Sequence, residues 1–157
     1  AKVAGTEIGV KEPQATFSAC FGEPFMPMHP GVYADLLSGK MEEHGAKAWL
    51  INTGWSGGSY GVGKRMKLRF TRAMLNAAMD GELDDVEYVV DARFGFEVPV
   101  ECPNVPIEIL QPRNTWEDVS SFDSTADKLA TMFNENFARY SAGVSDEVNA
   151  AAPQSLA

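Results

Sequence analysis

The 157-residue sequence has only two cysteines and two histidines, and neither pair has the spacing of a zinc site. Cys20 and Cys102 are far apart and outside any CxxC pattern. Two free thiols in a reducing compartment are therefore favoured over a disulfide or a metal pair. His29 and His44 lack Cys, His or Asp neighbours at metal spacing. We expect no metal site made by this chain alone.

The sequence also lacks a long apolar run and an excess of positive charge. No apolar run approaches the roughly 20 residues of a membrane span, and no basic, apolar signal segment stands at the start. The formal net charge of −9 repels phosphate backbones, which argues against a nucleic-acid binder. The 45% hydrophobic content is that of one ordinary folded domain. Because the chain starts with Ala and an irregular segment, we expect a fragment or a processed piece.

One short segment reverses the negative charge. Residues 59–72, "SYGVGKRMKLRFTR", contain a cluster of five basic side chains: Lys64, Arg65, Lys67, Arg69 and Arg72. Such a local reversal of sign is the main electrostatic clue in an acidic chain, because a few local cations suffice for a mononucleotide site.

This segment nearly matches a phosphate-binding loop, with Gly58, four residues, Gly63 and Lys64. The motif then requires a Ser or Thr that ligates Mg²⁺, but Arg65 stands there, and guanidinium only donates hydrogen bonds. The next helix is expected to begin at Thr71, too late for a loop that must run directly into a helix. A glycine-rich hairpin loop is therefore favoured over a phosphate-binding loop.

A nucleotide site of another kind remains open. Arg65 can donate to phosphate or ribose oxygens and stack its planar face on adenine. The extended backbone around Met66 can pair with the polar edge of a purine, and Thr71 can add a hydroxyl. A helix-capping role explains the presence of Thr71 better than a ligand contact does. The residues alone do not decide whether Arg65 binds a nucleotide. Trp55, a large ring in a glycine-rich loop, must either dock or be exposed.

Periodicity predicts a mixed α/β or α+β chain. We expect helices over 30–44 (ended by Gly45), 71–79 (ended by Gly81) and 123–140, and strands over 48–52, 64–68, 86–90 and 94–99. The glycine-rich loop covers 53–63. Prolines 103, 106 and 112 predict an extended connection between 102 and 113, and the polar composition of 141–157 predicts a disordered tail.

Several runs resemble the C-terminal part of ATP-dependent phosphoenolpyruvate carboxykinases. They are "GTEIGVKEPQATFSACFGEPFMPMHPGVYADLL", "LINTGWSGGSYGVGKRMKLRFTRAML", "ILQPRNTW" and "LATMFNENF", in this order. "NTGWSGGSYGVGKRM" is the most specific, and its long "SGGSYG" form is more similar to eukaryotic than to bacterial members. The resemblance covers residues 1–140 and implies a portion of the nucleotide-binding domain, with a mixed sheet and flanking helices. Residues 1–14 resemble part of a mobile lid.

The resemblance implies the reaction of oxaloacetate and ATP to phosphoenolpyruvate, ADP and CO₂, with Mg²⁺ and Mn²⁺. It assigns ATP contacts to Arg65, to the main chain of Met66 and to the hydroxyl of Thr71. The family's phosphate loop, metal ligands and oxaloacetate-binding residues lie upstream, so no catalytic or metal residue is expected in this chain. The chain alone is expected to be inactive and to bind ATP weakly at best.

The expected partners are the rest of the enzyme and its small substrates, with no nucleic acid and no membrane. The resemblance leaves the oligomeric state open, a homo-oligomer included, and a cytoplasmic location is the default. The alternative from another functional class is a stand-alone nucleotide-binding or interaction module without catalytic activity.

Overall fold

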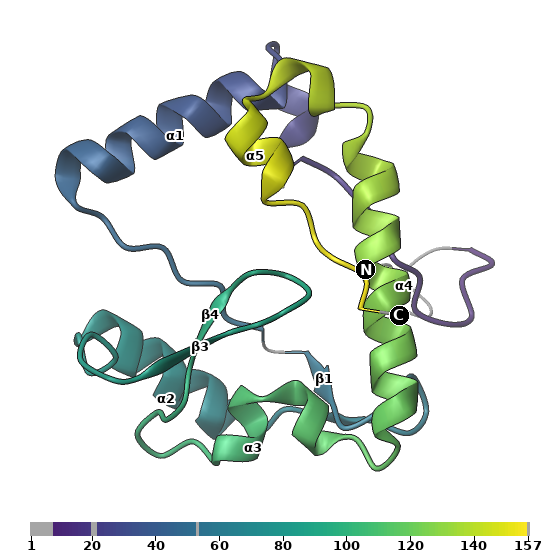
Figure 1. Ribbon diagram of the computed structural model, residues 1–157. Coiled ribbons are helices and arrows are strands. Elements are labelled where there is room, and N and C mark those ends of the chain that lie inside the picture. The colour runs from purple at the N-terminus through teal and green to yellow at the C-terminus, as the bar shows by residue number, and fades with distance from the viewer. Residues whose placement is uncertain (1–7, 20–21, 53, 157) are drawn as a thin grey trace. The chain divides into compact units, whose positions relative to one another are not determined.

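The computed structural model describes residues 8–19, 22–52 and 54–156, which form two compact units. The first unit combines the described residues up to Ala48 with Thr131–Ala152. The second combines Trp49–Ala130 with the described residues from Pro153 onward. Helix α4, Val119–Phe137, contributes residues to both units (Figure 1). Cys20 and residues 1–7 of the expected lid lie outside the described residues.

The first unit contains α1, Pro30–His44, whose predicted bounds are confirmed. His29 precedes the helix, and its Nδ1 accepts a hydrogen bond from the backbone N–H of Gly31 at 3.1 Å. Pro30 begins the helix, because its fixed φ suits the first turn. Gly45 ends it in the left-handed region, with φ 60°.

The apolar side chains of α1 are largely exposed. Val32, Leu36 and Leu37 follow the predicted helical spacing, but their exposed fractions are 40%, 59% and 62%. Among the described residues of this helix, only Gly31 is buried. The described residues of this unit therefore leave the apolar positions of α1 largely uncovered.

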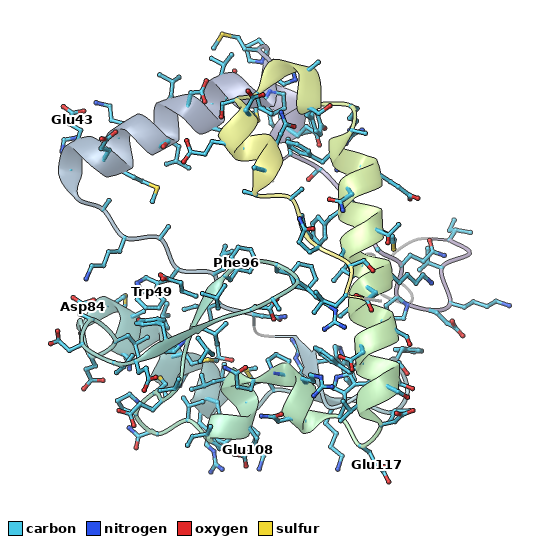
Figure 2. All side chains as sticks on the ribbon, in the orientation of Figure 1. Glu43, Trp49, Asp84, Phe96, Glu108 and Glu117 are labelled. Atoms are coloured by element: carbon cyan, nitrogen blue, oxygen red, sulfur yellow. The ribbon has the colours of Figure 1, made fainter. Side chains whose placement is uncertain are left out.

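The second unit has the larger core, built around α2, Leu68–Met79. Phe70 and Ala77 lie seven positions apart, on one face of that helix, and both are buried. Trp49, labelled in Figure 2, packs against this core and lies 6.3 Å from the Tyr88 ring, centroid to centroid. The other buried members of the core are Leu83, Cys102, Val105 and Leu110. Burial raises the pKa of the Cys102 thiol, so this cysteine is a packing residue.

Both sheets in the described residues are two-stranded and antiparallel. Strand β1, Trp55–Ser56, pairs with β2, Lys64–Arg65, and β3, Tyr88–Val90, pairs with β4, Glu97–Pro99. The expected mixture of helices and strands is confirmed. The strands predicted over 86–90 and 94–99 are shorter in the structure, at 88–90 and 97–99, and they pair as a hairpin. Within the described residues the strands form two separate hairpins rather than one mixed sheet.

Several predicted elements differ from the structure, and the first three concern residues 48–52, 64–68 and 102–113. Residues 48–52 form no strand, because an apolar run becomes a strand only when another strand pairs with it. The strand predicted over 64–68 ends at Arg65, and α2 begins at Leu68. The extended connection over 102–113 is wrong as well. Pro106 directly precedes the short helix α3, Ile107–Leu110, and Pro112 begins η2, Pro112–Thr115.

Helix α4 begins earlier than the predicted Asp123, because Asp118 caps it. The Asp118 carboxylate accepts the backbone N–H groups of Ser120 and Ser121 at 2.9 and 3.3 Å. Hydrogen bonds from the side chains and the backbone of these two serines lower the pKa of Asp118 to about 2. A capping aspartate of this kind fixes the start of the helix better than apolar periodicity does.

The segment after α4, expected to be disordered, contains two short helices in its described part. They are η3, Ser141–Gly143, and α5, Asp146–Ala150. The Ser145 hydroxyl caps α5 by accepting the Val148 N–H at 3.2 Å. Further on, the Leu156 N–H donates to the Asp127 carboxylate at 2.9 Å. Composition does not reveal such bonds, because their partners lie elsewhere in the chain.

Asp127 joins this C-terminal segment to Arg93 inside the second unit. Arg93 Nε donates to Asp127 Oδ1 at 2.8 Å, and the two side chains are 12% and 15% exposed. Arg93 also lies 3.3 Å from Asp123. The Arg93 hydrogen bond is the main cause that lowers the pKa of Asp127.

We expect Asp127→Asn to loosen residues 154–156 and to lower Tm by a few degrees at neutral pH. A carboxylate with a lowered folded pKa stabilises the protein above its unfolded pKa of about 3.9. In the unchanged protein this stabilisation is lost as the pH falls through the folded pKa, and in the variant it is missing throughout. Hydrogen exchange at the Leu156 amide, followed from pH 7 downward, measures the effect. Asp85→Asn, at an exposed turn, is the matched control, and equal exchange in both variants would contradict the prediction.

Candidate functional site

The glycine-rich segment forms a tight hairpin in the second unit. Trp55 lies opposite Arg65, and Ser56 lies opposite Lys64. The Met66 N–H extends this pairing by donating to the Gly54 carbonyl at 3.0 Å. At the tip, the N–H groups of Val62 and Gly63 both donate to the Ser59 carbonyl. The hairpin thus fixes the backbone of the basic segment.

Two glycines of the loop are required by its geometry. Gly58 has φ 154°, a conformation that residues with a side chain rarely adopt. Gly63 is buried, and a Cβ added to it would lie 2.5 Å from the Gly58 carbonyl oxygen. The backbone therefore crosses itself too closely for any side chain at Gly63.

A hydrogen-bond chain anchors the hairpin to η2. The Ser56 hydroxyl bonds to Thr115 Oγ1 at 3.1 Å, and Thr115 in turn donates to the Pro112 carbonyl at 2.7 Å. A Cβ at Gly57 would lie 3.0 Å from the Thr115 carbonyl oxygen, so the two segments are in close contact. This contact was not visible in the sequence, because 59 positions separate Ser56 from Thr115.

The loop is not followed directly by a helix. Strand β2 and the N-cap Lys67 stand between Gly63 and the first residue of α2. A phosphate-binding loop lacks such an intervening strand, so a glycine-rich hairpin remains favoured over a phosphate-binding loop. The predicted helix start at Thr71 is wrong: Thr71 lies in the first turn of α2, and its N–H is 3.5 Å from the Lys67 carbonyl. Lys67 takes the capping position because its extended backbone (φ −66°, ψ 131°) leads the strand into the helix.

The structure brings Met66 and Thr71 together. The Thr71 hydroxyl donates to Met66 Sδ at 3.7 Å, and Met66 packs against the core. The Met66 N–H is engaged by Gly54, whereas no described residue donates to its carbonyl oxygen. The main chain of Met66 can therefore offer an acceptor to a ligand, but not a donor.

Arg65 is exposed on β2, and its guanidinium has no carboxylate partner among the described residues. The sequence between Glu43 and Asp80 contains no carboxylate at all. The neighbouring cations are likewise unpaired with acids in the described part, and Arg69 lies 4.7 Å above the Phe70 ring. Unneutralised cations on a fixed backbone form a site of positive potential that suits phosphate groups.

A shallow hollow of about 440 Å³ lies beside this basic segment, at the start of α2. Arg69 and Phe70 form one side, and Asn104, Val105 and Pro106 form the other. Asn104 adopts a left-handed backbone with φ 62°, which asparagine tolerates better than most residues. The hollow is lined by one cation, one asparagine and apolar groups.

The described residues contain neither a cluster of metal-ligand side chains nor a membrane-spanning helix. No three His, Cys, Asp or Glu side chains gather there as ligands for a metal ion. The described residues thus supply no ligand set for Mg²⁺ or Mn²⁺. Among the helices of these same residues, none combines the length and the apolarity that crossing a membrane takes.

Comparison with known proteins identifies the family. A family model described as phosphoenolpyruvate carboxykinase matches residues 1–108. The chain belongs to the ATP-dependent phosphoenolpyruvate carboxykinase family. Curated relatives named phosphoenolpyruvate carboxykinase (ATP) include those of Flavobacterium johnsoniae, 60% identical over 153 residues, and Thermus thermophilus, 57% identical over 154 residues. A relative from Geotalea uraniireducens is 55% identical over 148 residues.

The alignments with these three relatives cover 98%, 98% and 94% of this carboxykinase chain, in the order given. It spans only 29%, 29% and 28% of their own lengths. The expected family is thereby confirmed. The closer similarity of the glycine loop to eukaryotic members stays a prediction, as do the contacts of Arg65, Met66 and Thr71 with ATP.

Proposed function

We propose that this chain is part of an ATP-dependent phosphoenolpyruvate carboxykinase and supplies the adenine and ribose side of its ATP pocket. The enzyme would convert oxaloacetate and ATP to phosphoenolpyruvate, ADP and CO₂. The observation that carries the proposal is the unneutralised Arg65 on a rigid hairpin, in a chain of this family. A cytoplasmic location is part of the same proposal.

Each of the three residues has a distinct role. Arg65 donates to phosphate or ribose oxygens and offers a planar face to the base. The Met66 carbonyl accepts a hydrogen bond from the exocyclic amino group of adenine, which guanine cannot supply at that position. The Thr71 oxygen accepts or donates a further contact, because its bond to the Met66 sulfur is weak and long.

The divalent metals and the groups that bind oxaloacetate would come from other parts of the enzyme. Catalysis in such a site depends on positioning and on neutralising the charge of the transferred phosphoryl group. This chain would contribute to positioning by fixing the nucleoside. Residues 1–14 are proposed as part of a lid that closes over the site, with residues 1–7 outside the described part. Residues 1–140 would together form the C-terminal portion of the nucleotide-binding domain.

The alternative, a stand-alone nucleotide-binding or interaction module, is less well supported. The exposed apolar side chains of α1 favour packing against further protein, since such a row is costly in water. We propose the remainder of the enzyme as the protein that covers it. Whether the enzyme assembles as a homo-oligomer stays open.

The proposal predicts activity in the full-length natural protein and none in the 157-residue chain alone. Formation of phosphoenolpyruvate that depends on both oxaloacetate and ATP is the measurement. Omission of either substrate gives the background rate. Carboxykinase activity in the isolated chain would overturn the assignment of metal and oxaloacetate ligands to other segments. Absence of activity in the folded full-length protein would favour the module.

A further inference from the structure

We propose that Trp55 forms an aromatic wall of the base subsite, on which the adenine ring of ATP stacks beside Arg65. This inference rests on the proposed nucleotide site and adds a residue to it. Its occupant is the purine ring rather than the phosphates.

The strand register places Trp55 and Arg65 together. The two residues are direct partners in the antiparallel β1–β2 pair. Side chains of directly opposite residues emerge on the same face of a sheet, with Cβ atoms about 5 Å apart. The indole and the guanidinium therefore share one face of the hairpin, and Met66, the next residue, packs against the core.

The environment of Trp55 differs from that of the other two tryptophans. Trp49 packs against the core, and Trp116 meets Phe122 edge to face with 5.6 Å between ring centroids. Trp55, in contrast, is 61% exposed. Its backbone is nevertheless fixed on both sides. The N–H of Gly54 donates to Asn52 Oδ1 at 3.0 Å, and Ser56 bonds to Thr115.

The charges around Trp55 indicate which kind of ligand binds beside its ring. An exposed indole on a hydrogen-bonded backbone, beside several unneutralised cations, matches the two halves of a nucleotide, because the ring offers a stacking surface and the cations attract phosphates. Any purine or pyrimidine can stack on the ring, so the Met66 carbonyl would provide the preference for adenine. Trp55 is thus a binding and positioning residue and takes no part in bond making.

The test measures equilibrium binding of ATP, adenosine and inorganic triphosphate to the full-length natural protein. Trp55→Ala is expected to raise the Kd for ATP and for adenosine by the same factor, about 5- to 150-fold, with triphosphate unchanged. Trp55→Phe keeps a stacking ring and should stay within about threefold of the unchanged protein. Tyr60→Ala is the matched control, since Tyr60 is an exposed aromatic of the same loop but has no strand partner.

Fluorescence gives a second readout that does not depend on the alanine variant folding. ATP should quench the unchanged protein, and Trp55→Phe should remove that quenching. Unchanged adenosine binding in Trp55→Ala, together with weaker ATP binding in Arg65→Ala, would overturn the role of Trp55 and leave the nucleotide site standing. Unchanged ATP binding in both variants would overturn the nucleotide site itself. Equal loss of affinity for adenosine and for triphosphate would indicate a structural role for Trp55 and contradict stacking.

Discussion

Arg65→Ala is expected to lower kcat/KM for ATP by about 10- to 150-fold in the full-length natural protein and to raise the KM for ATP. The guanidinium would lose a hydrogen bond to a charged group, which contributes about 1.5–3 kcal/mol. The loss should appear in full because no described carboxylate neutralises Arg65. Steady-state rates at varied ATP, with oxaloacetate saturating, measure it.

Two control variants distinguish the loss of the Arg65 contact from the loss of one positive charge. Lys128→Ala removes one positive charge at an exposed position of α4 and should leave the ATP kinetics nearly unchanged. Arg65→Lys keeps the charge but loses the planar fork, so it should recover only part of the affinity. ATP kinetics of Arg65→Ala that match those of Lys128→Ala would remove Arg65 from the site.

Elements whose stabilising contacts are local were predictable from the sequence. Helix α1 ends where predicted because its signals, Pro30 at the start and Gly45 at the end, act within one turn. Strands β3 and β4 were likewise predictable, with longer bounds, from two adjacent runs rich in valine and phenylalanine, whereas their pairing was not predicted. The strand predicted over 48–52 is absent from the structure, because an apolar run alone does not supply a second strand to pair with.

Long-range contacts were not predictable. Residues 154–156 are held by Arg93 and Asp127, and no composition rule connects these positions. The prolines of the 102–113 connection have two readings, extended or helix-starting, and only packing decides between them. Asp118 is a capping signal that the sequence did contain. The helix start was nevertheless predicted at Asp123, because the prediction followed the apolar periodicity of α4.

The candidate site shows the same division. The basic cluster and the failed phosphate loop were visible from spacing alone, but they did not decide the role of Arg65, which only the family resemblance assigned to ATP. The engaged N–H of Met66 and the pairing of Trp55 with Arg65 required the strand register. The bond from Thr71 to the Met66 sulfur shows that a threonine near a helix start need not cap it.

Gly63→Ala is expected to destabilise the hairpin by about 3 kcal/mol, near the upper end for overpacking, and to weaken ATP binding with it. The new methyl group would lie 2.5 Å from the Gly58 carbonyl oxygen and 3.1 Å from that of Ser56. Both are backbone atoms, so neither can rotate away as a flexible side chain would. Relief requires opening the loop, and this would move Arg65, which is two residues further along. Urea unfolding and ATP binding measure the two effects.

Gly39→Ala is the matched control, because it adds the same methyl group in the interior of α1, where no atom lies within 4 Å of it. It should stabilise the protein by up to about 1 kcal/mol, since alanine loses less backbone entropy than glycine on entering a helix. Equal stability of the two variants would mean that the loop relaxes freely. The close crossing at Gly63 would then not be what holds Arg65 in place. If the two variants change the free energy of unfolding in opposite directions, and only Gly63→Ala loses ATP binding, then the position of Arg65 depends on the path of the glycine loop.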